Sequence, residues 1–187
     1  GAVTQEEGNL FLVFLDSTHF DYSWPESTSL TCAPDGIDYL KVACKSGVEG
    51  VKQRYCNAIY FVDSLFGRFL HKLDATSQGK EAVVVVTGDH GEEFLEQENI
   101  FHASNLSMMQ TRVPIYCKLG QTVPHPQELA AHVDIFPTIL HHVLGENLFG
   151  HWFDGESLLE PRKNNFAISA RYNASRPPFE FLIYNGE

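Results

Sequence analysis

The stretch "EAVVVVTGDHGEEF", residues 81–94, holds the most regular strand signal of the chain together with its densest cluster of reactive side chains. Residues 82–86 form a continuous, mostly β-branched apolar run, which predicts a strand covered on both faces. Asp89 and His90 follow this run between two glycines, although neither residue type favours a strand. We expect the glycines to turn the chain so that both side chains converge, because glycine adopts backbone angles that other residues avoid.

An aspartate and a histidine that converge are ordinary ligands of divalent ions. The metal interpretation is therefore that Asp89 and His90 bind one ion, either zinc, manganese, calcium or magnesium. In the structural alternative, Asp89 caps a helix that begins at Glu92. Glu92 and Glu93 are then either partners of the metal ligands or acids favoured by the dipole of that helix, and we favour the helix for them.

Strands and helices alternate along the rest of the chain. The expected elements are a buried strand at 9–16, a long amphipathic helix at 51–73, a strand at 112–119, a helix at 132–145 and two late strands at 165–172 and 179–185. This order predicts an α/β fold with a mainly parallel sheet, in a single domain over residues 1–187. Ligands of such sheets bind beyond the carboxyl ends of the strands, which is where Asp89 and His90 lie.

Composition excludes some functions and leaves others open. The 187 residues are 43% apolar, which suits a packed domain, and the net charge of -11 argues against nucleic acid as a partner. The four cysteines lack CxxC spacing, so we expect no structural zinc site. Cys117 is predicted to be buried as a small apolar residue. Cys32 and Cys44 flank a short segment, and a disulfide between them is an alternative to free thiols.

Several segments together resemble the alkaline phosphatase superfamily, in its sulfatase and phosphoethanolamine-transferase branch. "VVVVTGDHGEEF" is similar to the strand and Asp–His pair that bind the catalytic metal there, and "YCNAIYFVDSLFGRFLHKLD" is similar to the preceding helix. "IFHASNLSMMQTRVPIYCKLG" and "HVDIFPTIL" resemble later segments of that family, in the same order. The resemblance covers residues 9–145 and implies an alkaline-phosphatase-like, three-layer α/β/α fold with a metal at Asp89 and His90.

The same resemblance implies roles for two further histidines. His102 matches a position that binds the anionic group of the substrate or a second metal. His19 matches a histidine that faces the same pocket from an earlier strand, and its structural alternative is a loop histidine packed against Tyr22 or Trp24. A neutral imidazole can bind a metal, and a protonated one can donate to a phosphoryl or sulfuryl oxygen. For His132 we expect a structural role.

The nucleophile of the family has no convincing counterpart in this sequence. Cys32 lies nearest to the pattern C-x-P-x-R of a formylglycine cysteine, but Gly36 occupies the position of the arginine. We therefore expect the chain to be the C-terminal part of a catalytic domain, truncated on its N-terminal side. The fragment alone is then expected to have little or no turnover.

Two functions follow from the resemblance. The first is a metal-dependent hydrolase or a phosphoryl or phosphoethanolamine transferase that acts on phosphate or sulfate esters. The alternative is a non-catalytic sulfatase-like module that binds or senses envelope lipid. Both imply an anionic ester or lipid headgroup as ligand, and a periplasmic or otherwise extracytoplasmic domain anchored to a membrane by segments outside this sequence.

Overall fold

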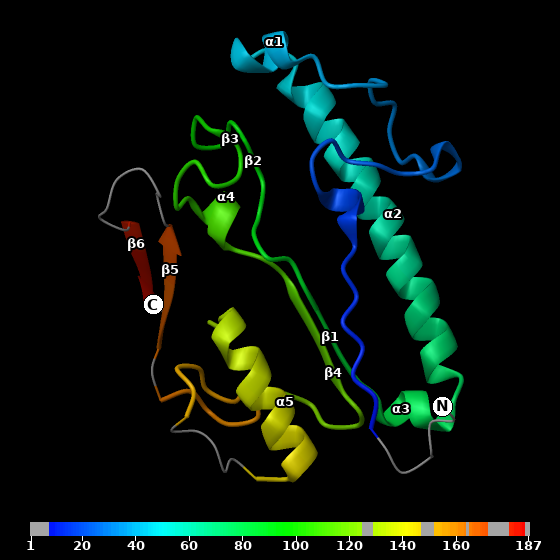
Figure 1. Ribbon diagram of the computed structural model, residues 1–187, viewed down its shortest axis with the longest axis vertical. Coiled ribbons are helices and arrows are strands. Elements are labelled where there is room, and N and C mark those ends of the chain that lie inside the picture. Colours follow the sequence, from blue (N-terminus) through cyan, green and yellow to red (C-terminus); the bar gives the residue numbers. More distant parts are fainter. Residues whose placement is uncertain (1–7, 125–128, 147–151, 164, 172–179, 186–187) are drawn as a thin grey trace. The chain divides into compact units, whose positions relative to one another are not determined.

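The computed structural model describes residues 8–124, 129–146, 152–163, 165–171 and 180–185. The chain divides into two compact units, residues 1–69 and 70–187, and each unit is described by itself. The elements labelled in Figure 1 are α1 (Tyr39–Ala43), α2 (Val48–Asp74), α3 (Ser77–Glu81), β1 (Val83–Thr87), β2 (Glu93–Phe94), β3 (Ile100–Phe101), α4 (Met108–Thr111), β4 (Ile115–Leu119), α5 (Ile135–Leu144), β5 (Phe166–Arg171) and β6 (Glu180–Asn185). The single domain expected over residues 1–187 stays a prediction.

Helix α2 confirms the long amphipathic helix expected at 51–73. Within the first unit its inner face buries Val51, Asn57 and Ala58. Asn57 is polar but fully satisfied, since its side-chain oxygen accepts from the N–H groups of Leu30 and Thr31, both at 2.8 Å. The apolar spacing therefore forms the helix, and one buried amide attaches a loop to it.

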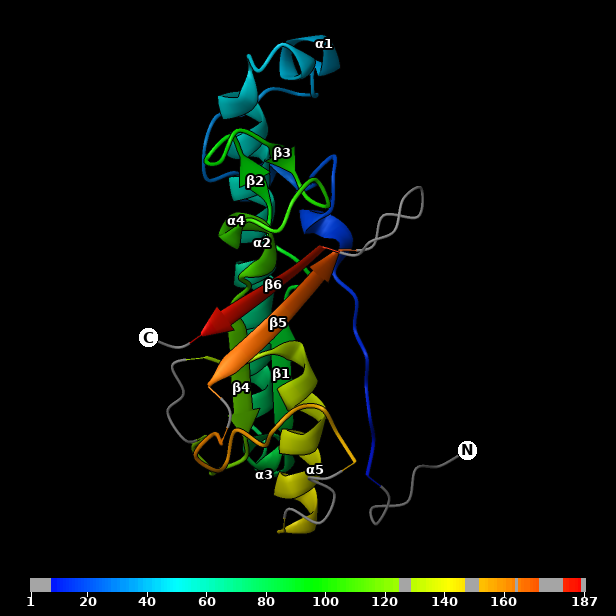
Figure 2. The same cartoon turned by 90° about the vertical axis from the view of Figure 1, so that its left-hand side faces the viewer.

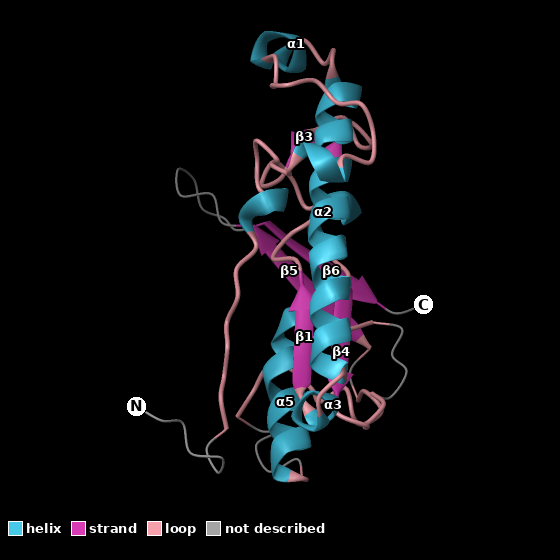
Figure 3. Ribbon diagram, turned by 90° about the vertical axis from the view of Figure 1, so that its right-hand side faces the viewer, coloured by secondary structure: helices cyan, strands magenta, loops and turns pink. Residues whose placement is uncertain are grey.

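The buried strand expected at 9–16 is wrong. Residues 8–15 have no regular structure (Figure 3). Their apolar side chains are exposed, and Leu12 is 98% accessible. An apolar run becomes a strand only where a neighbouring strand satisfies its N–H and C=O groups. None of the described residues pairs with this segment.

The expected mainly parallel sheet is also wrong for the described residues. β1 pairs with β4 in antiparallel register, with Val85 opposite Cys117, and the strand is half-buried rather than covered on both faces. A parallel pair needs a crossover that carries the chain back to the starting end of the first strand, usually through a helix. Between β1 and β4 the chain forms only the two-residue strands β2 and β3 and the four-residue α4, so it returns beside β1 in the opposite direction (Figure 1).

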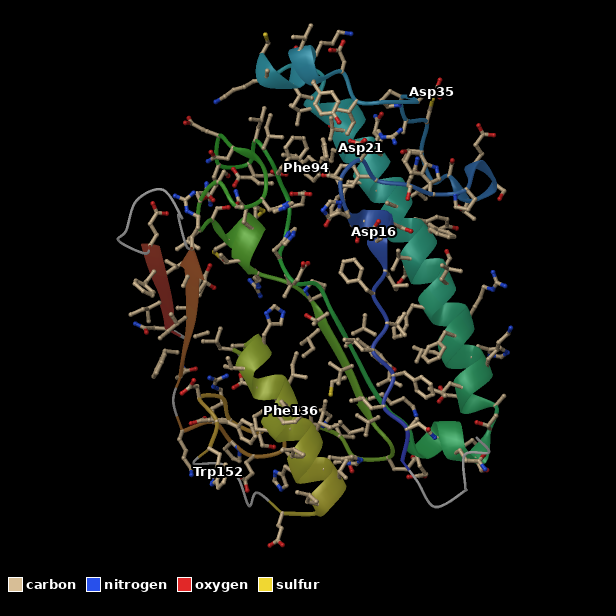
Figure 4. All side chains as sticks on the ribbon, viewed as in Figure 1. Asp16, Asp21, Asp35, Phe94, Phe136 and Trp152 are labelled. Carbon is tan, nitrogen blue, oxygen red and sulfur yellow. The ribbon has the colours of Figure 1, made fainter. Side chains whose placement is uncertain are left out.

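Helix α5 confirms the helix expected at 132–145, after a 3-10 turn at His132–Asp134, and Pro137 lies in its first turn; Asp134 occupies the N-cap position, but its side chain makes no capping hydrogen bond. The buried carboxylate of Asp134 instead accepts from Arg162 Nη1 at 2.6 Å and from the N–H groups of Ala131 and Glu156 at 2.7 and 2.8 Å. Asp134 therefore ties residues 152–163 to the start of α5. Phe136, labelled on α5 in Figure 4, packs edge to face against Phe153 in the same region.

The two late strands are confirmed as β5 and β6, which form an antiparallel pair (Figure 2). In this pair Ile168 lies opposite Ile183. The four cysteines are free, so the alternative of a bond between Cys32 and Cys44 is wrong. Cys117 is half-buried, and burial raises the pKa of its thiol. In the described part of the chain, no helix combines the length and the apolar character needed to span a bilayer.

Candidate functional site

The turn after β1 is held at both ends by hydrogen bonds. The Thr87 hydroxyl donates to the Pro114 carbonyl at 3.0 Å, and His132 Nε2 lies 2.8 Å from the Gly88 carbonyl oxygen. At the other end, the Gly91 N–H donates to the Gln110 carbonyl at 2.8 Å. His132 therefore has a structural contact of the kind expected, since it holds the peptide group that precedes Asp89.

Glycine is needed at position 91 for a reason the sequence did not indicate. Its backbone angle φ is not positive, but a Cβ atom there would lie 2.0 Å from the Met109 carbonyl oxygen. No real side chain tolerates that distance, so Gly91 allows the turn to approach the segment at Met109 closely. The glycine acts here through its small size and not through unusual dihedral angles.

Asp89 and His90 converge as expected. Asp89 Oδ1 accepts the His90 N–H at 3.0 Å and lies 3.8 Å from His90 Nε2. His90 Nδ1 lies 2.9 Å from the Gly91 carbonyl, which can only accept, so Nδ1 carries the proton and Nε2 presents a lone pair. Two metal bonds of about 2.1 Å span up to about 4.2 Å. One divalent ion can therefore contact both atoms, and the donor set of carboxylate and imidazole suits such an ion.

His102 lies directly against this pair. Its ring stacks on the ring of His90 with 3.7 Å between centroids, and its Nδ1 lies 2.9 Å from Glu92 Oε1. The Glu92 side chain is almost fully buried, with 4% of its surface exposed, whereas that of His102 is 28% exposed. Glu92 thus orients the imidazole and leaves Nε2 for a ligand. The structure brings together Asp89, His90 and His102, and their roles toward metal and substrate stay predictions.

Glu92 and Glu93 do not begin a helix. Glu93 starts the short strand β2, so the expected first-turn role of both acids is wrong, as is the alternative in which Asp89 caps a helix at Glu92. The local sequence resembled a helix start because acids often precede one. Only the fold shows that Glu92 contacts His102, ten positions further along the chain.

His19 belongs to the first unit, whereas the other three residues belong to the second. It is exposed, follows a short 3-10 turn at Asp16–Thr18, and its Nδ1 lies 2.8 Å from the Phe20 carbonyl. The expectation that His19 faces the same pocket as Asp89, His90 and His102 stays a prediction. Within the described ranges, no group of three or more His, Cys, Asp or Glu side chains is arranged to hold a metal.

The loop that carries His102 is organised around Glu93, which has no exposed surface. The donors to its two oxygens are the N–H groups of Gln97 and Asn99, the side-chain amides of Asn105 and Gln110, and the hydroxyl of Ser107. Burial alone raises the pKa of Glu93, but the hydrogen bonds from Ser107, Gln110 and the two N–H groups outweigh it and leave the pKa lowered. Glu93 is therefore an ionised, fully satisfied buried carboxylate, a role that its neighbours in the sequence do not indicate.

An apolar strand here brings a carboxylate and an imidazole to one point, beside a second imidazole, and such a donor set suits a divalent cation. The family model described as Sulfatase matches residues 3–145, so the chain belongs to the sulfatase family, within the alkaline phosphatase superfamily. Members of this superfamily are generally hydrolases or transferases, and the sulfatase-family enzymes typically use divalent metals. Membership also implies an alkaline-phosphatase-like α/β fold.

A relative supports the same assignment. The chain is 28% identical over 116 residues to the multifunctional alkaline phosphatase superfamily protein PehA of Trinickia caryophylli. The match covers 60% of this chain but only 22% of the relative, so the chain spans about a fifth of that protein's length. No solved structure matches the chain.

Proposed function

We propose that this chain supplies the metal-binding and anion-binding part of an enzyme that hydrolyses or transfers phosphate or sulfate esters. The observation that carries the proposal is the placement of His102 against the Asp89–His90 pair, with ring centroids of the two histidines 3.7 Å apart. A ligand bound to a cation at Asp89 and His90 would have an anionic oxygen within reach of His102. Membership of the sulfatase family supports the class of substrate.

Each side chain has a separate task in this proposal. Asp89 Oδ1 and His90 Nε2 hold the divalent ion, and the ion, when bound, polarises the ester and stabilises negative charge. In its protonated form, with a proton on each ring nitrogen, His102 donates from Nε2 to an oxygen of the phosphoryl or sulfuryl group and from Nδ1 to Glu92. The nucleophile, in this proposal, comes from a part of the protein outside this chain, so the chain alone has little or no turnover.

The natural protein is proposed to act outside the cytoplasm. By analogy with the sulfatase-like envelope proteins that the sequence resembles, we place the domain on the outer face of a membrane, with an anionic ester such as a lipid headgroup as substrate. The surplus of acidic residues, 24 against 13 basic, supports a substrate other than nucleic acid.

Metal binding tests the first half of the proposal. We expect the chain to bind Mn²⁺, chosen because it binds thiols weakly, and Asp89→Asn or His90→Ala to reduce the affinity by at least about 100-fold, since each removes a direct ligand. The measurement is calorimetric titration. His71→Ala, which alters an exposed histidine of α2, is the control and should bind as the wild type does. Equal affinity in all four proteins would contradict the metal site.

Turnover tests the second half and separates the enzyme from the non-catalytic alternative. The natural protein that contains this chain is expected to release nitrophenol from a nitrophenyl phosphate or sulfate, and His102→Ala is expected to reduce the rate by about 100-fold. Binding of Mn²⁺ and anionic lipid without turnover would support the sensing module instead. Enzyme-like rates from the 187-residue chain alone would show that the nucleophile lies within it.

A further inference from the structure

Gln110 connects the two parts of the candidate site. Its backbone carbonyl accepts the Gly91 N–H at 2.8 Å, at the end of the Asp89–His90 turn. Its side-chain nitrogen donates to Glu93 Oε2 at 2.9 Å and to Ser104 Oγ at 2.7 Å, and only 4% of the residue is exposed. One buried residue therefore contacts the ligand turn, the buried carboxylate and the loop that follows His102.

Glu93 holds the same loop from inside on both sides of His102. Its Oε1 accepts from N–H groups that precede His102, at Gln97 and Asn99, with distances of 3.0 and 2.9 Å. Its Oε2 accepts from groups that follow His102, including Ser107 Oγ at 2.7 Å. The carboxylate thus closes the loop around a single anionic centre, and the strands β2 and β3, two residues each, are too short to do so alone.

We infer that Glu93 and Gln110 form a positioning pair that fixes His102 relative to His90 and thereby sets the affinity of the site for an anion. The inference rests on the proposed function, because it assigns His102 to the anion. Neither residue touches the substrate, metal or reacting atoms in this arrangement. Glu93 acts on the loop from within, and Gln110 joins that loop to the turn through Gly91.

A positioning role for Glu93 and a merely structural role predict different effects of a Glu93 substitution on metal and anion affinity. Asp89 and His90 contact each other, Gly91 and the ring of His102, but neither contacts the Glu93 carboxylate, so metal affinity should depend on that carboxylate far less than anion affinity does. His102 depends on the loop that the carboxylate closes. A change confined to Glu93 should therefore weaken anion binding and leave metal binding nearly unchanged.

The experiment compares Glu93→Gln with the control Glu98→Gln in the 187-residue chain. Glutamine keeps the shape of Glu93, but its NH₂ group then faces groups that themselves donate to Glu93. Glu98 lies exposed in the same loop, and Glu98→Gln removes the same charge. We expect Glu93→Gln to weaken inorganic phosphate binding to the Mn²⁺-loaded chain by about 10-fold or more, with less than about a 2-fold change in Mn²⁺ affinity. Glu98→Gln should match the wild type in both.

A second readout follows the histidine directly. In the metal-free chain, the ring nitrogen signals of His102 are expected to report a proton on Nδ1 and to shift or broaden in Glu93→Gln. If Glu93→Gln does not fold, as judged by circular dichroism, Ser107→Ala removes one of the donors and should give a smaller effect in the same direction. A folded variant with unchanged phosphate affinity and unchanged His102 signals would overturn the positioning role.

The outcomes separate this inference from the proposed function. If the wild-type chain binds Mn²⁺ but no phosphate, His102 does not bind an anion, and the proposed effect of Glu93 on anion affinity is then also wrong. The ring signals of His102 would still show whether Glu93 positions the imidazole. If the wild-type chain binds phosphate and Glu93→Gln binds it equally well, with unchanged His102 signals, the proposed function stands and the positioning role of Glu93 is wrong.

Discussion

Two long loops of this protein, residues 16–38 in the first unit and 92–107 in the second, are each held by one charged side chain, and the two charges are opposite. Arg54 donates to backbone carbonyls at Asp21, Tyr22, Pro34 and Asp35, of which Asp21 and Asp35 are labelled in Figure 4. Glu93 accepts from N–H, amide and hydroxyl groups. A loop with little regular structure must satisfy most of its polar backbone groups in some other way, and a single charged side chain can bond to several of its acceptors or several of its donors.

The difference lies in burial and in titration. Arg54 is half-buried and faces carbonyl groups that do not titrate, and a guanidinium stays charged at any ordinary pH. Glu93 is fully buried, and its charge depends on a proton. The two candidate histidines, His19 and His102, lie in these loops. The loops are therefore expected to differ in how much their central charged side chain stabilises the fold and in how sensitive they are to acid.

The largest effect is expected from Glu93→Ala. The change leaves several buried donors without an acceptor, and each unsatisfied group costs about 1–3 kcal/mol, so the free energy of unfolding should fall by about 3–5 kcal/mol. Urea denaturation monitored by circular dichroism measures this difference. Glu98→Ala, in the same loop but exposed, is the control and should stay within about 0.5 kcal/mol of the wild type. Similar losses in both variants would mean that the carboxylate does not hold the loop.

A smaller loss is expected from Arg54→Ala. The carbonyls that it leaves are partly exposed and can bond to water, so the free energy of unfolding should fall by about 2 kcal/mol. Arg54→Lys should recover little of it, because an ammonium group cannot span carbonyls on both sides as the planar guanidinium does. Arg68→Ala, an exposed arginine of α2, is the control for the same measurement. Full recovery by lysine would show that charge alone matters.

The smallest effect is a difference in acid sensitivity between the loops. The pKa of Glu93 is lowered from its ordinary value of 4.5, so its stabilisation is complete above pH 4.5 and is lost as the pH falls through the lower, folded-state pKa. Amide exchange, corrected for intrinsic rates, should therefore speed up below pH 4.5 at Gln97 and Asn99, which donate to Glu93. It should change less at Leu30 and Thr31, which donate to the uncharged Asn57.

The variant Glu93→Gln provides the control for that comparison. Without a titrating carboxylate, exchange at Gln97 and Asn99 should be faster at neutral pH and should lose most of its acid dependence. Equal acid dependence at Leu30 and Thr31 in the wild type would instead point to a general loosening of the chain.

Much of the site was predictable because its signals are local. The β-branched run at 82–86 led directly into the turn that brings Asp89 and His90 together, and the family resemblance pointed to His102. Glu93 and Gln110 were not predictable, since nothing in their neighbours distinguishes a buried carboxylate from a solvated acid. Their roles depend on contacts up to seventeen residues apart.

Order along the chain was enough to predict α2, β1, α5, the two late strands and the convergence of Asp89 and His90, because periodicity and turn residues act over a few positions. Pairing and burial depended on the folded chain. Whether β1 lies beside an antiparallel partner, whether residues 10–15 find one, and whether Glu92 meets a helix or a histidine depend on which distant segments satisfy the same hydrogen-bonding groups. When the hydrogen-bonding partner of a backbone group lies far away in the chain, the residues next to that group do not indicate it. Only the three-dimensional arrangement therefore decides strand pairing and burial.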